Sequence, residues 1–212
     1  MIKAVLLDLD GTLVDADMSV VIAKIVDKHQ EVSQNNHNFH QGITKGLEGL
    51  IASINLFKGI SLSQIEERLS GNDCLMPGAR ALVNFLHENG IISILASGSI
   101  LPILQHYQQE LKLDYVIGSR PRIQDNIIMG ISEDDYPHPD FKLYESRKIL
   151  EGLGIEPHET VAIGDSPGDK SKFLFAGKSI AVNPKGGIEK FADFVIVDDL
   201  SRAIPIIEEL NK

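Results

Sequence analysis

The chain has 212 residues, of which 43% are apolar and 24% are charged. A chain of this length and composition can bury a sizeable core, as one large domain or one domain with an insertion, and extended disorder is excluded. The net charge of −10 argues against a nucleic acid backbone or an anionic membrane surface as the main partner.

The sequence also indicates a compartment. The single cysteine, Cys74, has no partner for an internal disulfide, and the Met-Ile-Lys-Ala start lacks the features of a secretion signal. No run of about 18 apolar residues is present to span a bilayer. We therefore expect a soluble protein of the cytoplasm that has no membrane partner.

An apolar run near the start of the chain predicts the first buried strand. Residues 4–7 read Ala-Val-Leu-Leu, which is typical of a strand covered on both faces of a parallel sheet. The polar residues Asp8, Asp10, Gly11 and Thr12 follow directly. The strand therefore ends in two carboxylates beside a residue that permits a tight turn.

The next stretch, residues 15–75, interrupts this pattern. It separates the first strand from the next by about sixty residues and contains helical spacing without a convincing buried strand. We expect it to form a helical cap domain, inserted into a core domain of residues 1–14 and 76–212, and to act as a mobile lid. Phe39 and Phe57 are expected in the core of this cap.

Strands and helices alternate through the rest of the chain. Apolar runs predict strands over residues 91–96, 160–163, 179–182 and 194–197. Helical spacing covers residues 100–111, 140–153 and 200–210, and a further helix is expected to begin at Pro77 and to end at Gly90. This alternation indicates an α/β fold with a Rossmann-like parallel sheet.

Residues 119–131 break the alternation. Asp125-Asn126 lies between the apolar-containing pairs Arg122-Ile123 and Ile127-Ile128. Such a pair of turn residues between two short extended segments predicts a small hairpin.

Polar residues follow three of the predicted strands. Asp8, Ser97 and Asp165 should converge, because ligands of an open parallel sheet bind outside the carboxyl ends of its strands. Carboxylates gathered there repel one another unless a cation joins them. The oxygen-only ligand set points to Mg²⁺.

The same residue types suit phosphoryl transfer. Asp8 is the candidate nucleophile, and Asp10 could protonate the leaving oxygen and later activate water. Ser97 and the amides after it are expected to open the next helix and to donate hydrogen bonds through its positive end. Lys142 falls in the first turn of a helix expected to be capped by Asp140, where a lysine is unfavourable to the helix dipole, and this misfit suggests a functional cation.

With these residues in place, the chain resembles the haloacid dehalogenase superfamily of phosphohydrolases over its whole length. Four motifs occur in order: Asp8-Leu9-Asp10-Gly11-Thr12, Ser97-Gly98, Lys142 and Gly164-Asp165-Ser166-Pro167-Gly168-Asp169. Met76-Pro77-Gly78-Ala79, Gly118-Ser119-Arg120 and the 23-residue step from Lys142 to Asp165 are most similar to its phosphoserine phosphatase-like branch.

The resemblance implies a Mg²⁺-dependent phosphatase that hydrolyses a small phosphorylated metabolite through an aspartyl-phosphate. It makes Asp8 the nucleophile and Asp10 the acid and base. It assigns Mg²⁺ to Asp8, the Asp10 carbonyl and Asp165, with Asp169 supporting the metal site. The residues that it assigns to the phosphoryl oxygens are Leu9, Asp10, Ser97, Gly98 and Lys142.

The sequence departs from this branch in the residues expected to bind an amino acid. Phosphoserine phosphatases typically carry a Glu after the first motif and an Arg in the cap, and here Asp17 and, on an ungapped alignment from Phe39, Gly46 take those places. Lys45 is adjacent, but successive helix residues point about 100° apart. Gly168 stands where that branch usually has Asn. Asp17 remains a candidate substrate contact, and we expect L-phosphoserine to be a poor substrate.

Three other functions are compatible with parts of the pattern. A phosphomutase or phosphotransferase shares all these motifs and differs in the acceptor. A phospho-receiver module places its acidic pair and its acceptor Asp on different strands, whereas Asp8 and Asp10 share one strand end. A non-catalytic binding protein is disfavoured because no motif position is damaged.

Overall fold

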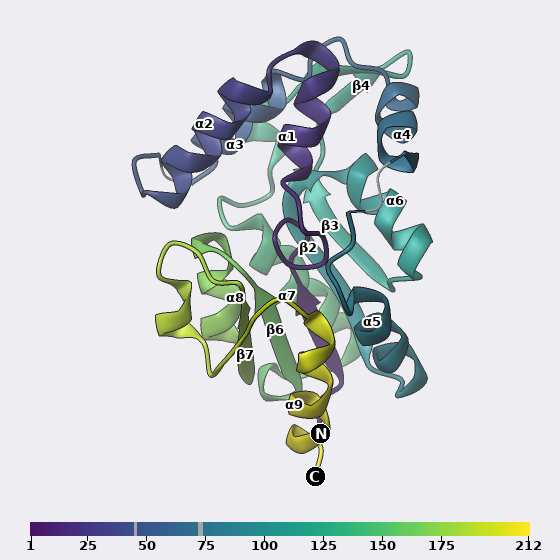
Figure 1. The fold of residues 1–212 in the computed structure, drawn as a ribbon, viewed down its shortest axis with the longest axis vertical. Coiled ribbons are helices and arrows are strands. Elements are labelled where there is room, and N and C mark those ends of the chain that lie inside the picture. The colour runs from purple at the N-terminus through teal and green to yellow at the C-terminus, as the bar shows by residue number, and fades with distance from the viewer. Residues whose placement is uncertain (45, 72–73) are drawn as a thin grey trace.

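A six-stranded parallel sheet forms the centre of the protein, with the strand order β3-β2-β1-β6-β7-β8 (Figure 1). The computed structural model describes residues 1–44, 46–71 and 74–212. The strands are β1 (Ala4–Leu7), β2 (Ile92–Ile100), β3 (Tyr115–Ser119), β6 (Thr160–Gly164), β7 (Lys178–Val182) and β8 (Phe194–Ile196). Five of them confirm the predicted strands, and β3 was not predicted.

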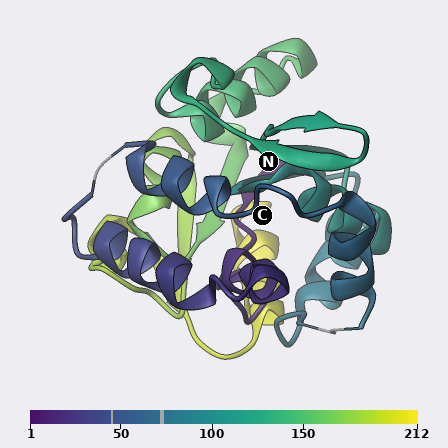
Figure 2. The same ribbon diagram turned by 90° about the horizontal axis from the view of Figure 1, so that it is seen from above.

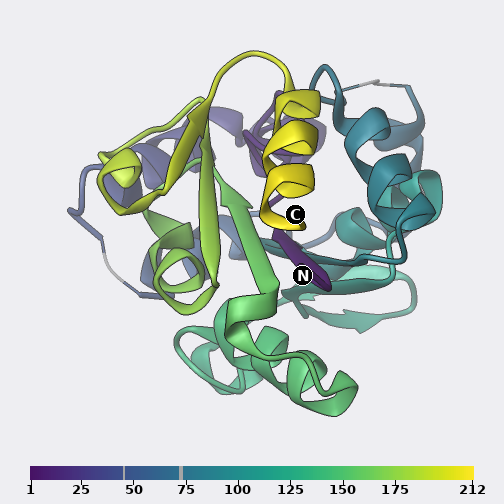
Figure 3. The same cartoon turned by 90° about the horizontal axis from the view of Figure 1, so that it is seen from below.

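Helices cover both faces of this sheet because its strands are apolar on both faces. In β1, Val5 and Leu7 pack into one core cluster while Ala4 and Leu6 pack into the other, and all four are fully buried. The first cluster includes α5 (Ala79–Glu88), α6 (Leu101–Leu111) and α9 (Ala203–Leu210). The second includes α7 (Phe141–Leu153) and α8 (Lys170–Phe175). Figure 3 shows these helices on the two sides of the sheet.

Two helix starts differ from the sequence-based expectation. α5 begins at Ala79 and not at Pro77, because Gly78 adopts a left-handed conformation with a φ of 79°. β2 continues to Ile100, so that Ser97 lies inside the strand and does not open α6. Pairing of β2 with β3 is maintained through a register shift beyond Ala96, which keeps this segment extended.

The insertion, residues 15–75, lies over the carboxyl ends of the strands (Figures 1 and 2). In its described part it forms α1 (Met18–Ala23), α2 (His29–His40), α3 (Glu48–Asn55) and α4 (Leu62–Ser70), with a short 3₁₀ helix, Lys24–Val26, after α1. Both chain termini lie at the opposite end of the molecule (Figure 1).

The two connections between the insertion and the sheet run side by side. The Asp15 amide donates to the Cys74 carbonyl at 2.8 Å, and the Met76 amide donates to the Leu13 carbonyl at 2.9 Å. These bonds fix the chain where it leaves and re-enters the core. They lie next to the predicted domain boundaries, which stay a prediction.

The predicted hairpin is present as β4 (Arg122–Gln124) and β5 (Ile127–Gly130). Asp125 and Asn126 connect the strands with φ values of 49° and 68°. Two consecutive positive φ angles suit the right-handed twist of a tight hairpin, and Asp and Asn tolerate them better than most residues.

This hairpin is attached to the insertion by backbone hydrogen bonds. The Gly59 amide donates to the Ile128 carbonyl, and the Ile128 amide donates to the Ile60 carbonyl, both at 2.9 Å. Asn55, the last residue of α3, bonds both the amide and the carbonyl of Ile131 through its side chain. The hairpin therefore pairs with the segment that links α3 to α4.

Within the residues that the structure describes, no helix combines the length and the apolar character that a bilayer crossing requires.

The first prediction concerns the turn before α5. Gly78→Ala should lower the free energy of unfolding more than Gly90→Ala. Both glycines have a positive φ, which costs an Ala side chain about 1–2 kcal/mol. A Cβ at Gly78 would also lie 2.1 Å from Asp199 Oδ1 and 2.3 Å from the Ser201 amide nitrogen, whereas one at Gly90 would meet nothing within 4 Å. Urea denaturation of the two variants measures the difference, and equal losses would contradict the steric argument.

Candidate active site

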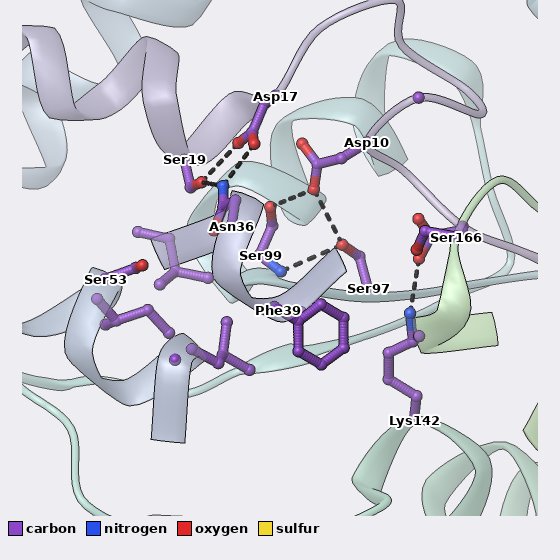
Figure 4. A pocket seen from close by; sticks show the side chains of 18 of the residues that line it. Asp10, Asp17, Ser19, Asn36, Phe39, Ser53, Ser97, Ser99, Lys142 and Ser166 are labelled. Atoms are coloured by element: carbon purple, nitrogen blue, oxygen red, sulfur yellow. Dashed lines mark hydrogen bonds and ion pairs between the residues drawn. The ribbon is translucent and has the colours of Figure 1, made fainter. Parts of the chain in front are cut away.

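The site lies where β1 and β6 end side by side, at the point where the strand order reverses. Asp8 follows β1, and Asp165 follows β6. Both line a cavity of about 360 Å³ between the sheet and the insertion (Figure 4). The predicted convergence of strand ends is therefore seen in the structure.

Three buried carboxylates gather here, two of which, Asp8 and Asp165, line the cavity. Asp8, Asp165 and Asp169 each offer an oxygen within 4.8 Å of the others. Three carboxylates so close together in a desolvated place repel one another strongly. The cluster therefore requires positive charge nearby.

Three lysines supply part of that charge. Lys142, in the first turn of α7 as predicted, places its Nζ 2.8 Å from Asp8 Oδ1 and 3.2 Å from Asp169 Oδ1. Lys172 Nζ lies 2.9 Å from Asp169 Oδ1. Lys185 Nζ lies 2.9 Å from Asp165 Oδ2 at the half-exposed edge of the site.

Lys172 and Lys185 were missed by the sequence analysis. Lys172 is fully buried and also donates to the Ala96 carbonyl at 3.3 Å. A lysine beside Phe173 and three residues after Asp169 was the available indication of a buried pair. Lys185 lies in the loop after β7, twenty residues from Asp165 in sequence, and nothing local indicated the contact.

The helix that carries Lys142 starts differently from the expectation in one respect. Asp140 occupies the N-cap position of α7, but its side chain makes no capping hydrogen bond. The Asp140 amide instead donates to His138 Nδ1 at 2.9 Å. The position was predicted correctly and the side-chain cap was not.

The pKa values of the three carboxyls diverge. Burial, and then the charge of Asp169, raises the pKa of Asp8, while Lys142 and Lys172 act in the opposite direction. Burial, followed by Asp8 and Asp169, raises the pKa of Asp165 to about 7. Burial also acts to raise the pKa of Asp169, but the two lysines outweigh it and hold that pKa below its usual range. Asp169 is therefore the anion that anchors the lysines.

Asp169 is also fully engaged by hydrogen bonds. Its Oδ2 accepts the amides of Asp165 and Ser166 at 3.1 and 3.2 Å, and its Oδ1 faces Lys142 and Lys172. Asp8 and Asp165 are thus the carboxylates left to bind a cation. Hard oxygen donors of this kind suit a divalent metal site.

Asp10 lies above this cluster and has its own partners. Its Oδ1 accepts the Met18 amide at 2.6 Å, and its Oδ2 accepts the hydroxyls of Ser99 at 2.7 Å and Ser97 at 3.3 Å (Figure 4). The Ser97 hydroxyl oxygen in turn accepts the Ser99 amide at 3.1 Å. Ser99, which the sequence analysis did not single out, therefore helps to orient Asp10.

The Asp10 carboxyl is tuned to exchange a proton near neutral pH. Burial, followed by the charges of Asp17 and Asp8, raises its pKa to about 7. Asp17 itself is the N-cap of α1, where its carboxylate accepts from the Ser19 hydroxyl and from Asn36 Nδ2, both at 2.5 Å. A carboxyl with a pKa near the working pH is suited to general acid and base catalysis.

Two other predicted contacts are placed less directly. Gly98 lines the cavity, whereas Leu9 is fully buried in the core and does not line it. Gly46 lines the cavity just before α3 begins. Lys45 lies outside the described residues. Phe39, expected in the core of the insertion, is half-buried and lines the cavity (Figure 4).

Comparison with known proteins gives a consistent result. The family model of haloacid dehalogenase-like hydrolases matches residues 2–171. A phosphoserine phosphatase of Archaeoglobus fulgidus is 29% identical over 191 residues, which cover 90% of this chain and 55% of that protein. A phosphoserine phosphatase of Idiomarina loihiensis is 26% identical over 192 residues, which cover 91% of this chain and 87% of that protein. The chain thus spans about half the length of the first relative and most of the second.

Solved structures agree with these relatives. A phospho-aspartyl intermediate analogue of phosphoserine phosphatase superposes with a TM-score of 0.87 at 26% identity, covering 97% of this chain and 98% of that one. A substrate-bound phosphoserine phosphatase complex gives a TM-score of 0.85 at 25% identity with the same coverage.

The second prediction concerns the buried Asp165. Its folded-state pKa of about 7 exceeds the ordinary value of 3.8, so the folded protein retains a proton that the unfolded chain releases between these pH values. Stability in chelator should therefore fall as pH rises from about 4 to about 7, with about 1.4 kcal/mol for each unit of pKa difference. The free energy of unfolding of Asp165→Asn should fall less steeply with rising pH, and this variant should be more stable than the parent at pH 8. Thermal unfolding at several pH values measures this.

Two comparisons sharpen that measurement. Magnesium chloride should stabilise the parent at pH 8 and should stabilise Asp165→Asn less, because the variant lacks an anionic ligand. Asp193→Asn is the control, since hydrogen bonds from Lys178 and Ser179 outweigh partial burial and lower the pKa of Asp193. Its loss should destabilise the protein at pH 8. A steeper pH dependence in Asp165→Asn than in the parent would refute the assignment.

Proposed function

The chain belongs to the haloacid dehalogenase-like hydrolases, and we propose that it is a Mg²⁺-dependent phosphatase that hydrolyses a small phosphomonoester through an aspartyl-phosphate on Asp8. One observation carries the proposal: a buried carboxylate at the cavity floor lies 2.8 Å from the ammonium of Lys142, beside a second carboxyl whose pKa is close to neutral. The phosphoserine phosphatase relatives support the same chemistry.

Asp8 is the proposed nucleophile. One of its carboxylate oxygens attacks the phosphorus atom of the substrate, and the bond between phosphorus and the ester oxygen breaks. Lys142 and Lys172 act against the burial and the Asp169 charge that raise the pKa of Asp8, and so favour its anionic, nucleophilic form.

Asp10 is the proposed acid and base. In its protonated form it gives a proton to the departing ester oxygen, and it then takes a proton from the water that attacks the aspartyl-phosphate. This second attack breaks the bond between phosphorus and Asp8 and releases orthophosphate. The hydrogen bonds from the Met18 amide and the Ser99 hydroxyl hold the carboxyl in place for both steps.

The transferred phosphoryl group needs donors on its remaining oxygens. We assign this role to Lys142, the Ser97 hydroxyl and the backbone of Leu9, Asp10 and Gly98. Ser97 and Gly98 lie in β2 and not at a helix start, so the backbone donor at Gly98 comes from the strand.

Asp8, Asp165 and the Asp10 carbonyl would hold the metal ion. When bound, a divalent cation supplies positive charge that stabilises the phosphoryl group during transfer. We propose Mg²⁺ because the available donors are hard oxygens. Asp169 supports this site by fixing Lys142 and Lys172 and by accepting the Asp165 amide.

We also propose the division into a core domain, residues 1–14 and 76–212, and a cap domain, residues 15–75. The paired connections on either side of Val14 and Leu75 support these boundaries. A cytoplasmic location is supported by the lone Cys74, and the net charge of −10 supports a small-molecule partner over nucleic acid or a membrane surface.

The third prediction tests the nucleophile. Asp8→Asn should reduce turnover by a factor on the order of 10³ or more while the thermal unfolding temperature stays close to that of the parent, because the amide retains the volume but cannot attack. Orthophosphate release with and without a sugar acceptor also distinguishes hydrolysis from phosphotransfer. Asp134→Asn, at an exposed carboxylate, is the control.

Acid quenching during turnover of radiolabelled substrate, followed by peptide mapping, locates the phosphoenzyme. We expect the label on Asp8 in the parent protein and no label in Asp8→Asn. Label on any other residue would overturn the proposal.

The fourth prediction tests the proton donor. Asp10→Asn should lower kcat/KM by about 10²–10⁴ for an alkyl phosphate and by much less for p-nitrophenyl phosphate, whose leaving group departs without a proton. Steady-state kinetics with both esters measures the difference. Equal losses for the two would show that Asp10 does not protonate the leaving oxygen.

A further inference from the structure

We propose that the cavity selects a phosphomonoester whose leaving group is an uncharged, largely apolar alcohol, and that it discriminates against leaving groups that carry a carboxylate. The inference rests on the proposed function, because it concerns the same cavity. It follows from three properties of the cavity wall: its apolar character next to the phosphoryl position, the distribution of its charges, and the pairing of its polar groups.

Apolar side chains approach the place where the phosphoryl group would lie. The two Leu50 methyl carbons lie 3.4 and 3.6 Å from the position of a Cβ on Gly98. Phe39 Cε1 lies 3.7 Å from the position of a Cβ on Gly168, and Lys142 Nζ lies 3.8 Å from that same point. The first carbon atoms of a leaving group would therefore contact Leu50 and Phe39.

The apolar surface continues away from the phosphoryl position. The insertion contributes further apolar side chains to the wall, namely Ala16, Leu47, Ile54 and Phe57, and β2 and α6 contribute Ile100 and Ile103. A cavity of about 360 Å³ with such a wall accepts carbon atoms readily and offers a charged group little compensation for lost water.

The charges of the wall disfavour an anionic leaving group. Among the described residues that line the cavity, the cations are Lys142 and Lys185, and both belong to the core, where they pair with buried carboxylates. From the insertion, Asp15 and Asp17 line the cavity. A carboxylate on the leaving group would thus be desolvated near acidic residues, and none of the described residues of the insertion that line the cavity offers it a counter-charge.

Two polar groups on this side, the Asp17 carboxylate and the Ser53 hydroxyl, already have partners within the insertion. Both oxygens of Asp17 accept hydrogen bonds, from Ser19 and Val20 on one side and from Asn36 on the other (Figure 4). Ser53 Oγ, on α3, accepts from Asn35 Nδ2 at 3.2 Å. These groups are satisfied without a substrate ammonium, so an uncharged alcohol leaves none of them unpaired.

The test compares four esters with nearly equal carbon skeletons on the unaltered protein with magnesium. These are n-propyl phosphate, 3-aminopropyl phosphate, the phosphate ester of 3-hydroxypropionate and L-phosphoserine. The kcat/KM for n-propyl phosphate should exceed that of each carboxylate-bearing ester by at least about tenfold, and should also exceed that of the amine. A higher value for any charged ester would overturn the inference.

p-Nitrophenyl phosphate separates this inference from the proposed function. If that activated ester and all four alkyl esters are inert, the phosphatase assignment itself fails. If it is hydrolysed and a carboxylate-bearing ester is preferred, the phosphatase assignment stands and the selectivity is wrong.

A substitution on α3 tests the electrostatic cause. Ser53→Arg should introduce a cation into the wall and raise the ratio of kcat/KM for L-phosphoserine over n-propyl phosphate by about tenfold. Ser53→Gln, which is long but uncharged, is the matched control and should leave that ratio low. An unchanged ratio in a folded Ser53→Arg protein would contradict a charge-based selection. If this variant does not fold, the comparison of esters on the unaltered protein decides the question.

Discussion

The mutual repulsion of Asp8, Asp165 and Asp169 is the constraint around which the site is organised. Burying three carboxylates together is favourable only if cations share the space. Asp169 is paired with Lys142 and the buried Lys172, whereas the cation that pairs with Asp165 among the described residues is the half-exposed Lys185. The site thus contains one carboxylate, Asp169, whose counterions are fixed and one carboxylate, Asp165, whose counterion is exchangeable. This is the arrangement that a reversibly bound metal ion needs.

The same constraint explains why the sheet side of the cavity and the insertion side differ in chemical character. Charge is concentrated at the sheet, where β1, β6 and α7 bring the carboxylates and lysines together. The insertion contributes mainly carbon atoms and internally paired polar groups. In the function that we propose, binding of the phosphoryl group depends on the charged cluster at the sheet, and choice of the leaving group depends largely on the insertion.

The parts predicted from the sequence were those with local patterns. Residues 4–7 form a continuous apolar run, and the two turn residues after Gln124 produce a hairpin, so both features were confirmed. β3 was missed because its residues alternate little and its pairing with β2 is a long-range property. The extension of β2 through Ser97 depends on the same pairing. Lys185 could not be assigned because the fold brings it to its partner Asp165, whereas Lys172 lies only three residues after its partner Asp169 and was overlooked.

The attachment of the hairpin to the insertion has a consequence for protein engineering. The edge of β5 pairs with the backbone around Gly59 and Ile60, and Asn55 closes the junction at Ile131. The insertion and the hairpin therefore form one structural unit that is discontinuous in sequence. A chimera that exchanged residues 15–75 alone would set foreign backbone against a resident strand edge, whereas one that also exchanged the hairpin would transfer a complete interface.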